Sequence, residues 1–127
     1  MRKLILILIA GLAATGVPLV FGTIGVGEPG WRKALALAHI WGGFFFLVVF
    51  PLYAWDHVRA HRAWLRLWAA VTVTGVTQLT AGALLILTGV VLLLYQSQAW
   101  SLLRIVHHGL TYVLLLSIAG HFMSPKR

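Results

Sequence analysis

Long apolar runs separated by short polar segments dominate the pattern of this chain. Four of these runs predict helices at about residues 3–24, 33–57, 64–95 and 99–122. Each is long enough to cross the hydrocarbon core of a bilayer, which takes roughly 20 apolar residues. We therefore predict an all-α membrane protein, in which residues 1–127 form a single domain, a bundle of four transmembrane helices.

The composition agrees with this pattern. Of the 127 residues, 61% are hydrophobic and 9% are charged, and the mean hydropathy is +0.94, far from the values of water-soluble domains. Cysteine is absent, which excludes disulfides, iron–sulfur clusters, c-type haem attached through paired cysteines, and thiolate catalysis. Histidine is therefore the main candidate for a metal ligand.

The net charge of +8 comes from basic residues that flank the apolar runs. Because they do not line a polar surface, we expect no nucleic-acid partner and interpret them as signals of membrane topology. Seven of the ten fall on one side of a four-pass arrangement, so the positive-inside rule places both termini in the cytoplasm and predicts a multi-pass protein of the bacterial inner membrane. The seven are Arg2, Lys3, Arg59, Arg62, Arg66, Lys126 and Arg127, and the other three are Arg32, Lys33 and Arg104.

All six histidines lie in or just after the second and fourth predicted helices. These two helices run parallel, so His39 comes at nearly the same depth as His107 and His108. At about 100° per residue, His39 and His57 return to one face of their helix, and His107 and His121 lie within about 40° of each other. Each of the two helices thus presents two histidines stacked along its length.

Two helices with histidines at matched depths can supply both axial ligands of a haem iron, with the porphyrin edge-on between them. Ligation also explains the cost of placing an imidazole in hydrocarbon. We prefer His107 to its neighbour His108 as a ligand because His107 shares a face with His121, and His108 stays the alternative. His61 lies among arginines at a helix end, where we expect it to be solvated.

Glycines accompany the histidines. Gly75, Gly82 and Gly89 recur every seventh residue in the third predicted helix, and Gly42 follows His39 by three residues. A porphyrin needs helix surfaces that are bare where the ring lies, so Gly42, Gly82 and Gly89 are candidate cofactor contacts. Close packing of helices through small residues explains the same stripe without a cofactor.

A short repeat connects the two halves of the chain. Thr15-Gly-Val17 in the first predicted helix echoes Thr88-Gly-Val90 in the third, and a helix bearing histidines follows each. The echo indicates either a duplicated helix pair or a chance recurrence of common residues.

The histidine spacing resembles that of four-helix membrane b-type cytochromes, including the haem-bearing membrane anchors of bacterial hydrogenases and formate dehydrogenases. The resemblance is carried by His39-Ile-Trp-Gly-Gly43, Trp55-Asp-His57, His61-Arg-Ala-Trp64, Val106-His-His-Gly109 and His121. It implies one haem b held by His39 and His107 near the outer face, and a second held by His57 and His121 near the inner face. One departure is Tyr53, which stands 14 residues after His39 where these families have a histidine. His57 is left to serve the inner site, so the number of haems is one or two.

The resemblance further implies electron transfer across the bilayer, to or from quinone, by a subunit of a larger respiratory or photosynthetic complex. The chain has only two carboxylates, Glu28 and Asp56, so we expect no independent catalysis, and whether it serves an oxidoreductase enzyme stays open. One alternative is a chlorophyll-binding antenna or accessory subunit, because one histidine suffices for each such pigment. The other is a cofactor-free structural subunit of a membrane assembly, in contact with lipid and other subunits.

Overall fold

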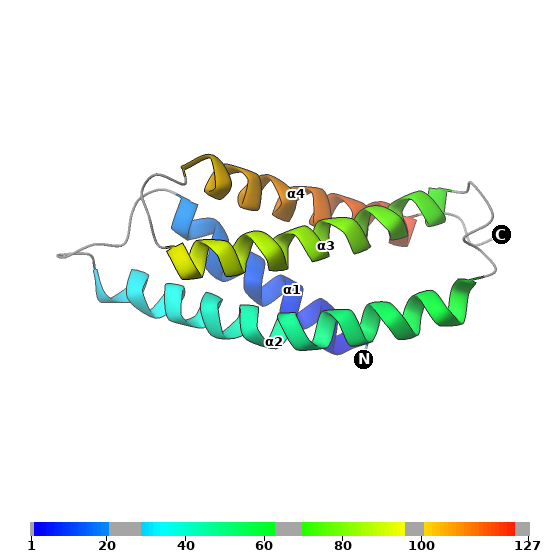
Figure 1. The fold of residues 1–127 in the computed structure, drawn as a ribbon, viewed down its shortest axis with the longest axis horizontal. Helices are drawn as coiled ribbons and strands as arrows, with labels where there is room; N and C mark the ends of the chain where they lie inside the picture. Colours follow the sequence, from blue (N-terminus) through cyan, green and yellow to red (C-terminus); the bar gives the residue numbers. More distant parts are fainter. Residues whose placement is uncertain (1, 21–28, 63–69, 96–100, 124–127) are drawn as a thin grey trace. The chain divides into compact units, whose positions relative to one another are not determined.

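The computed structural model describes residues 2–20, 29–62, 70–95 and 101–123. These residues confirm the predicted all-α class, since they form four long helices and one short 3₁₀ helix (Figure 1). In chain order the elements are α1 (Arg2–Gly16), the 3₁₀ helix η1 (Val17–Val20), α2 (Gly30–His61), α3 (Ala70–Tyr95) and α4 (Ser101–Met123).

The observed helix ends differ from the predicted ones mainly in α2. This helix begins three residues before the predicted segment 33–57 and ends four residues after it. The apolar pattern stops near residue 55, but a helix bonds its own backbone and continues into the polar interfacial segment that follows. Residues 21–24, 64–69 and 99–100 of the predicted helices lie outside the described residues.

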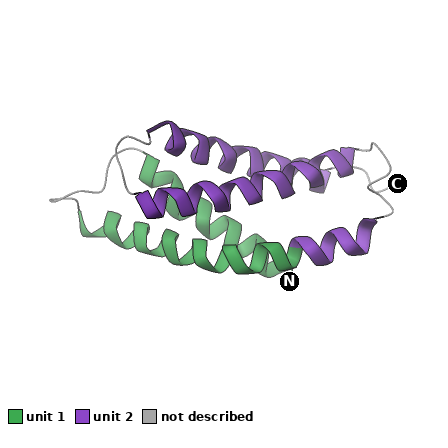
Figure 2. Ribbon diagram, viewed as in Figure 1, with its two compact units in different colours: residues 1–53 green, residues 54–127 purple. Residues whose placement is uncertain are grey.

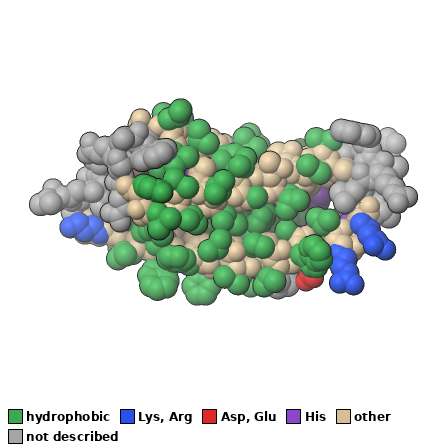
Figure 3. Space-filling view, viewed as in Figure 1, with side chains coloured by type: hydrophobic (Ala, Val, Ile, Leu, Met, Phe, Trp, Pro, Cys, Tyr) green, Lys and Arg blue, Asp and Glu red, His purple; other side chains and the backbone are tan. Residues whose placement is uncertain are grey.

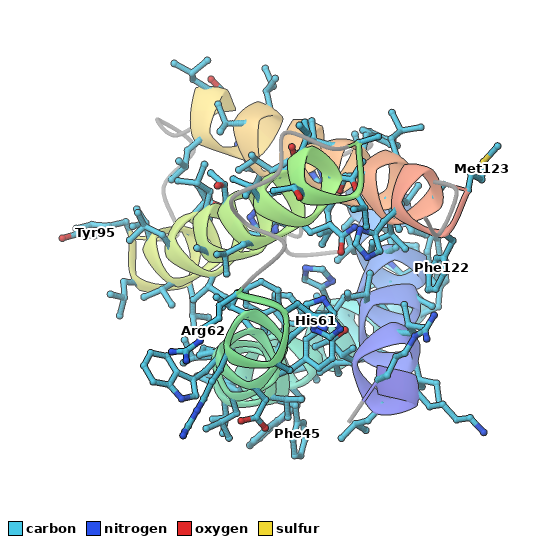
Figure 4. All side chains as sticks on the ribbon, turned by 90° about the vertical axis from the view of Figure 1, so that its right-hand side faces the viewer. Phe45, His61, Arg62, Tyr95, Phe122 and Met123 are labelled. Carbon is cyan, nitrogen blue, oxygen red and sulfur yellow. The ribbon has the colours of Figure 1, made fainter. Side chains whose placement is uncertain are left out.

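Each of the four helical segments is long and apolar enough to cross a membrane, by length and composition. The segments are Arg2–Val20 (19 residues), Gly30–His61 (32), Ala70–Tyr95 (26) and Ser101–Met123 (23). Only 11% to 17% of the residues in their apolar windows are buried within the chain, and side chains such as Phe45, Tyr95 and Met123 extend away from the helices (Figure 4). Water-soluble proteins rarely expose so much apolar surface. The chain is a multi-pass membrane protein.

The distribution of side-chain types fits this class. Hydrophobic side chains cover the face shown in Figure 3, whereas the Lys and Arg side chains drawn there lie at the ends of helices. Arg32 and Lys33 belong to the first turn of α2, and Arg59 and Arg62 stand at its other end. Long basic side chains at helix ends reach the lipid headgroups, as expected for membrane-spanning helices.

Two prolines mark local changes in the helices. Pro18 lacks a backbone N–H, and the α-helix α1 gives way to η1 at Val17–Val20. Pro51 lies inside α2, which continues past it to His61. Membrane helices tolerate such a proline because neighbouring groups satisfy the freed backbone carbonyl.

The chain divides into two compact units, residues 1–53 (unit 1) and residues 54–127 (unit 2) (Figure 2). Unit 1 contains α1, η1 and α2 as far as Tyr53. Its two helices run antiparallel, because His39 contacts Thr15 while Gly42, further along α2, contacts Leu12, earlier in α1.

Unit 2 contains the C-terminal end of α2 together with α3 and α4. Helices α3 and α4 lie side by side as an antiparallel pair (Figure 1). Ala81 in α3 and Leu114 in α4 are buried, at 2% and 3% exposure. Near the middle of the pair, Gln78 Nε2 donates a hydrogen bond to the backbone oxygen of Ser117 at 3.0 Å. These contacts fix the register in which the α3 threonines meet the α4 histidines.

Candidate functional site

Three of the four predicted ligand histidines make the same hydrogen bond, from the ring nitrogen Nδ1 to a threonine hydroxyl on the preceding helix. The pairs, measured from Nδ1 to Oγ1, are His39 with Thr15 (3.1 Å), His107 with Thr88 (2.7 Å) and His121 with Thr74 (3.0 Å). The first pair lies within unit 1 and the other two lie within unit 2. One local arrangement therefore occurs three times in the described residues.

The three threonine hydroxyls also lie within hydrogen-bond distance of their own helix backbone. Thr88 Oγ1 donates to the backbone oxygen of Leu84 at 2.8 Å, and Thr15 and Thr74 make the equivalent bond four residues back at 2.8 and 2.9 Å. A hydroxyl has one hydrogen and two lone pairs. A hydroxyl that gives its hydrogen to the helix backbone accepts from the histidine, and in that arrangement Nδ1 carries the ring hydrogen.

The position of the hydrogen decides which nitrogen can bind a metal. In a neutral imidazole with its hydrogen on Nδ1, the lone pair is on Nε2. For His39 a second contact supports the same tautomer, because its Nδ1 also lies 3.1 Å from the backbone oxygen of Leu12, which can only accept. Histidines that bind metals commonly donate the other ring N–H to a fixed acceptor in this way. The donor set therefore fits a metal-centred group bound through Nε2.

A glycine follows each of the three threonines and lies beside the imidazole. A Cβ atom built on these glycines would approach the ring carbon Cε1 to different degrees: 2.7 Å from Gly16 to His39, 3.4 Å from Gly89 to His107 and 3.9 Å from Gly75 to His121. Real Cβ atoms do not come within 3.0 Å of another heavy atom, so His39 occupies space that only a glycine leaves open. At the other two positions the fit is looser.

The threonines are the part of this site that the sequence analysis missed. The tripeptide Thr-Gly-Val occurs three times, and the copy at residues 74–76 adds to the predicted echo of residues 15–17 and 88–90. Thr74 and Thr88 are 14 residues apart in α3, as are His107 and His121 in α4. Fourteen residues span about 21 Å along a helix axis. Because the two spacings are equal, antiparallel helices bring Thr88 against His107 and Thr74 against His121 at the same time. These equal spacings were the feature of the sequence from which the threonine–histidine contacts could have been predicted.

Within unit 2, the structure also brings His57 and His121 together. Their ring centres are 6.4 Å apart and their planes are inclined by 65°. An imidazole nitrogen lies about 2 Å from a bound metal, so two imidazoles on opposite sides of one metal have ring centres about 6 Å apart. The spacing of this pair therefore matches that of two axial ligands.

Other histidines surround these ligand candidates. The exposed His61, labelled at the end of α2 in Figure 4, has its ring centre 4.5 Å from that of His57 and donates from Nδ1 to the backbone oxygen of His57 at 2.9 Å. His108 lies beside His107, with ring centres 6.1 Å apart and planes 79° apart. Of these two neighbours, His107 is the one bonded to Thr88.

The two histidines of the predicted outer pair belong to different units, His39 to unit 1 and His107 to unit 2. His39 contacts α1 through Thr15, and His107 contacts α3 through Thr88. The pairing of these two histidines stays a prediction.

The predicted glycine contacts have different surroundings. A Cβ on Gly42 would lie 3.0 Å from Leu12 Cδ2, so this glycine serves close packing of α1 against α2. Gly82 is buried in α3, between the two threonine–glycine pairs of that helix. Gly89 lies against His107. Packing therefore accounts for Gly42 within unit 1, while Gly89 contacts a candidate ligand.

Among the described residues there is no group of three or more His, Cys, Asp or Glu side chains that could hold a metal ion. A bare metal ion would need such a group, whereas a metal already held in a prosthetic group takes one or two protein ligands. Paired or single imidazoles with Nε2 as the ligand fit the second case.

Comparison with known proteins assigns no family to the chain. No protein-family model, no curated protein and no solved structure matches it. Its class follows from the fold alone, an all-α multi-pass membrane protein with four candidate spans.

Proposed function

We propose that this chain is a membrane-embedded b-type cytochrome subunit that passes electrons across the bilayer within a larger complex. The observation that carries the proposal is the threonine bond to Nδ1 of three imidazoles in apolar helices, because a bond at Nδ1 leaves Nε2 as the nitrogen available to a metal. Haem b supplies an iron centre that accepts and releases one electron. One or two haems per chain fit the available histidines.

His57 and His121 would hold the proposed inner haem. Their ring centres, 6.4 Å apart, are spaced as two ligands of one metal would be. His39 and His107 are the proposed ligands of the outer haem, and His107 is preferred to His108 because it holds the threonine bond. Gly82 and Gly89 are the proposed α3 surface along the porphyrin.

The separation of the ligands along one helix suits transfer across a membrane. His107 and His121 are 14 residues apart in α4, or about 21 Å along its axis. The hydrocarbon core is about 30 Å thick, so ligands at these two depths cover most of it. Basic residues at the helix ends are suitable partners for haem propionates. We propose Arg32, Lys33 and Arg104 for the outer propionates, and Arg59, Arg62 and Arg66, of which Arg66 lies outside the described residues, for the inner ones.

The proposed setting is the bacterial inner membrane, with both termini in the cytoplasm. In the predicted four-pass arrangement seven of the ten basic residues fall on the side of the termini, which supports this orientation by the positive-inside rule. The described residues are almost entirely helix, so other subunits or quinone are the proposed electron donor and acceptor. The protein then works as a respiratory or photosynthetic subunit and makes no chemical bond itself.

The test is a reduced-minus-oxidised absorption spectrum of the purified full chain, with pyridine haemochrome quantitation, repeated on His39→Ala and His57→Ala. Two b haems per chain, of which each variant loses one, support the complete proposal. One haem that only His39→Ala removes would restrict the site to the outer leaflet. Detection of a magnesium pigment that absorbs red light would favour a chlorophyll-binding subunit over a cytochrome. A colourless protein would favour a structural subunit without a cofactor.

A further inference from the structure

We infer that Thr15, Thr74 and Thr88 are positioning residues, whose hydroxyls select the ligating nitrogen of three imidazoles and raise the basicity of those ligands. The inference rests on the proposed function only for the identity of the metal group. The tautomer of each imidazole is a property of the chain itself and can be measured without a cofactor.

The bond to histidine is not an automatic result of placing threonine in a membrane helix. Threonines in helices commonly bond back to the carbonyl four residues earlier. Thr77 in α3 does so, at 2.9 Å from the oxygen of Val73, and Thr111 in α4 does so at 3.1 Å from the oxygen of His107. Among the described residues, neither has a histidine side chain as its hydrogen-bond partner. The three threonines that precede glycine all have one.

At His39 the glycine that follows the threonine also bears on the position of the ring. At residue 16 a Cβ would stand 2.7 Å from Cε1 of His39, so the ring could not lie beside Thr15 if any other residue followed it. The threonine supplies the acceptor and the glycine supplies the space.

The chain of bonds has an electronic consequence. The backbone carbonyl polarises the threonine hydroxyl, and a polarised hydroxyl is a better acceptor for the Nδ1 hydrogen. A stronger bond at Nδ1 makes Nε2 a more basic ligand, and a more basic ligand favours oxidised over reduced iron. Each threonine therefore lowers the reduction potential of the iron that its own histidine binds.

The effect is expected to be greatest at Thr88. Its bond to His107 is the shortest of the three, at 2.7 Å, and Thr88 is buried, at 7% exposure. Hydrogen bonds are stronger where water is excluded. His39 is expected to respond least to its threonine, because its Nδ1 is shared between Thr15 and the oxygen of Leu12.

The first experiment measures tautomers by ¹⁵N NMR of histidine-labelled full chain in detergent micelles, without added haem. The expected result is an Nδ1–H tautomer for His107. In Thr88→Val this signal moves to the Nε2–H form or to a mixture, and in Thr88→Ser, which keeps the hydroxyl, it stays. The matched control Thr77→Val removes an equivalent hydroxyl from the same helix and leaves His107 unchanged. An unaltered Nδ1–H signal in Thr88→Val would overturn the inference.

The second experiment is a redox titration of the haem-loaded chain. Thr88→Val is expected to raise the midpoint potential of one haem and Thr74→Val that of the other, with roughly a 10-fold loss of haem affinity in each. Thr88→Ser restores both values, and Thr77→Val changes neither. If the wild-type chain binds no haem, the proposed function fails while the NMR result still decides the positioning role. If haem binds and Thr88→Val leaves both potential and tautomer unchanged, the positioning role is wrong and the proposed function stands.

Discussion

The backbone of Gly16 lies against the imidazole of His39 so closely that a methyl group has no room between them. A Cβ on Gly16 would stand 2.7 Å from Cε1 and 3.1 Å from Nδ1 of that ring. The ring bonds to Thr15, the residue before this glycine. The same ring therefore contacts Gly16 and bonds to Thr15. Gly75 and Gly89 lie beside His121 and His107 in the same way, but at longer distances.

These glycines give a graded prediction. Gly16→Ala should displace His39, break its bond to Thr15 and lower the free energy of unfolding by about 1–3 kcal/mol, as overpacking does. Gly89→Ala should have a small effect and Gly75→Ala almost none, since their Cβ atoms would lie 3.4 and 3.9 Å from the neighbouring rings. Unfolding by SDS in mixed micelles measures the series. Equal losses at all three positions would contradict it.

A second prediction separates the adjacent histidines of α4. His107→Ala should remove one haem per chain, because His107 is the one held by Thr88. His108→Ala should retain the wild-type haem content, because His107 keeps the ring orientation that presents Nε2. Pyridine haemochrome quantitation of the two purified variants measures the difference. Loss of haem in His108→Ala alone would reverse the assignment of the ligand.

The sequence was sufficient to predict the all-α class and four apolar helices, because transfer of an apolar run into a bilayer depends on composition and length. The ends of α2 were harder to predict. This helix extends to His61 through Asp56 and Arg59, residues that carry no apolar signal. Its backbone is satisfied by the helix itself, so polar side chains at the interface do not end it.

The role of the threonines could not be read from single residues. A threonine in a membrane helix is usually satisfied by its own backbone, and only the register between two helices shows whether a histidine lies opposite. That register is set by contacts such as Gln78 with Ser117. The equal spacing of Thr74 with Thr88 and of His107 with His121 contained the information, but it has meaning only once α3 and α4 are known to be antiparallel.

The bond that sets this register gives a third prediction. Gln78→Leu removes the hydrogen bond from α3 to the backbone oxygen of Ser117 and should lower the free energy of unfolding by about 0.6–2 kcal/mol, the range measured for polar contacts between membrane helices. Thr77→Val is the control, because the hydroxyl of Thr77 bonds within its own helix. SDS unfolding in mixed micelles compares the two. A larger loss in the control would show that Gln78 does not couple the helices.

The last prediction concerns orientation in the membrane. In the predicted four-pass arrangement the basic residues on the side of the termini outnumber those on the other side by seven to three, and each Lys or Arg near a span resists translocation. A green fluorescent protein fused after Arg127 should therefore fluoresce in the cytoplasm, and alkaline phosphatase fused there should be inactive. Replacing Arg59 and Arg62 by Gln leaves five against three, so the orientation should persist. Active phosphatase at this fusion point in the unaltered chain would invert the topology and exchange the outer and inner positions proposed for the two histidine pairs.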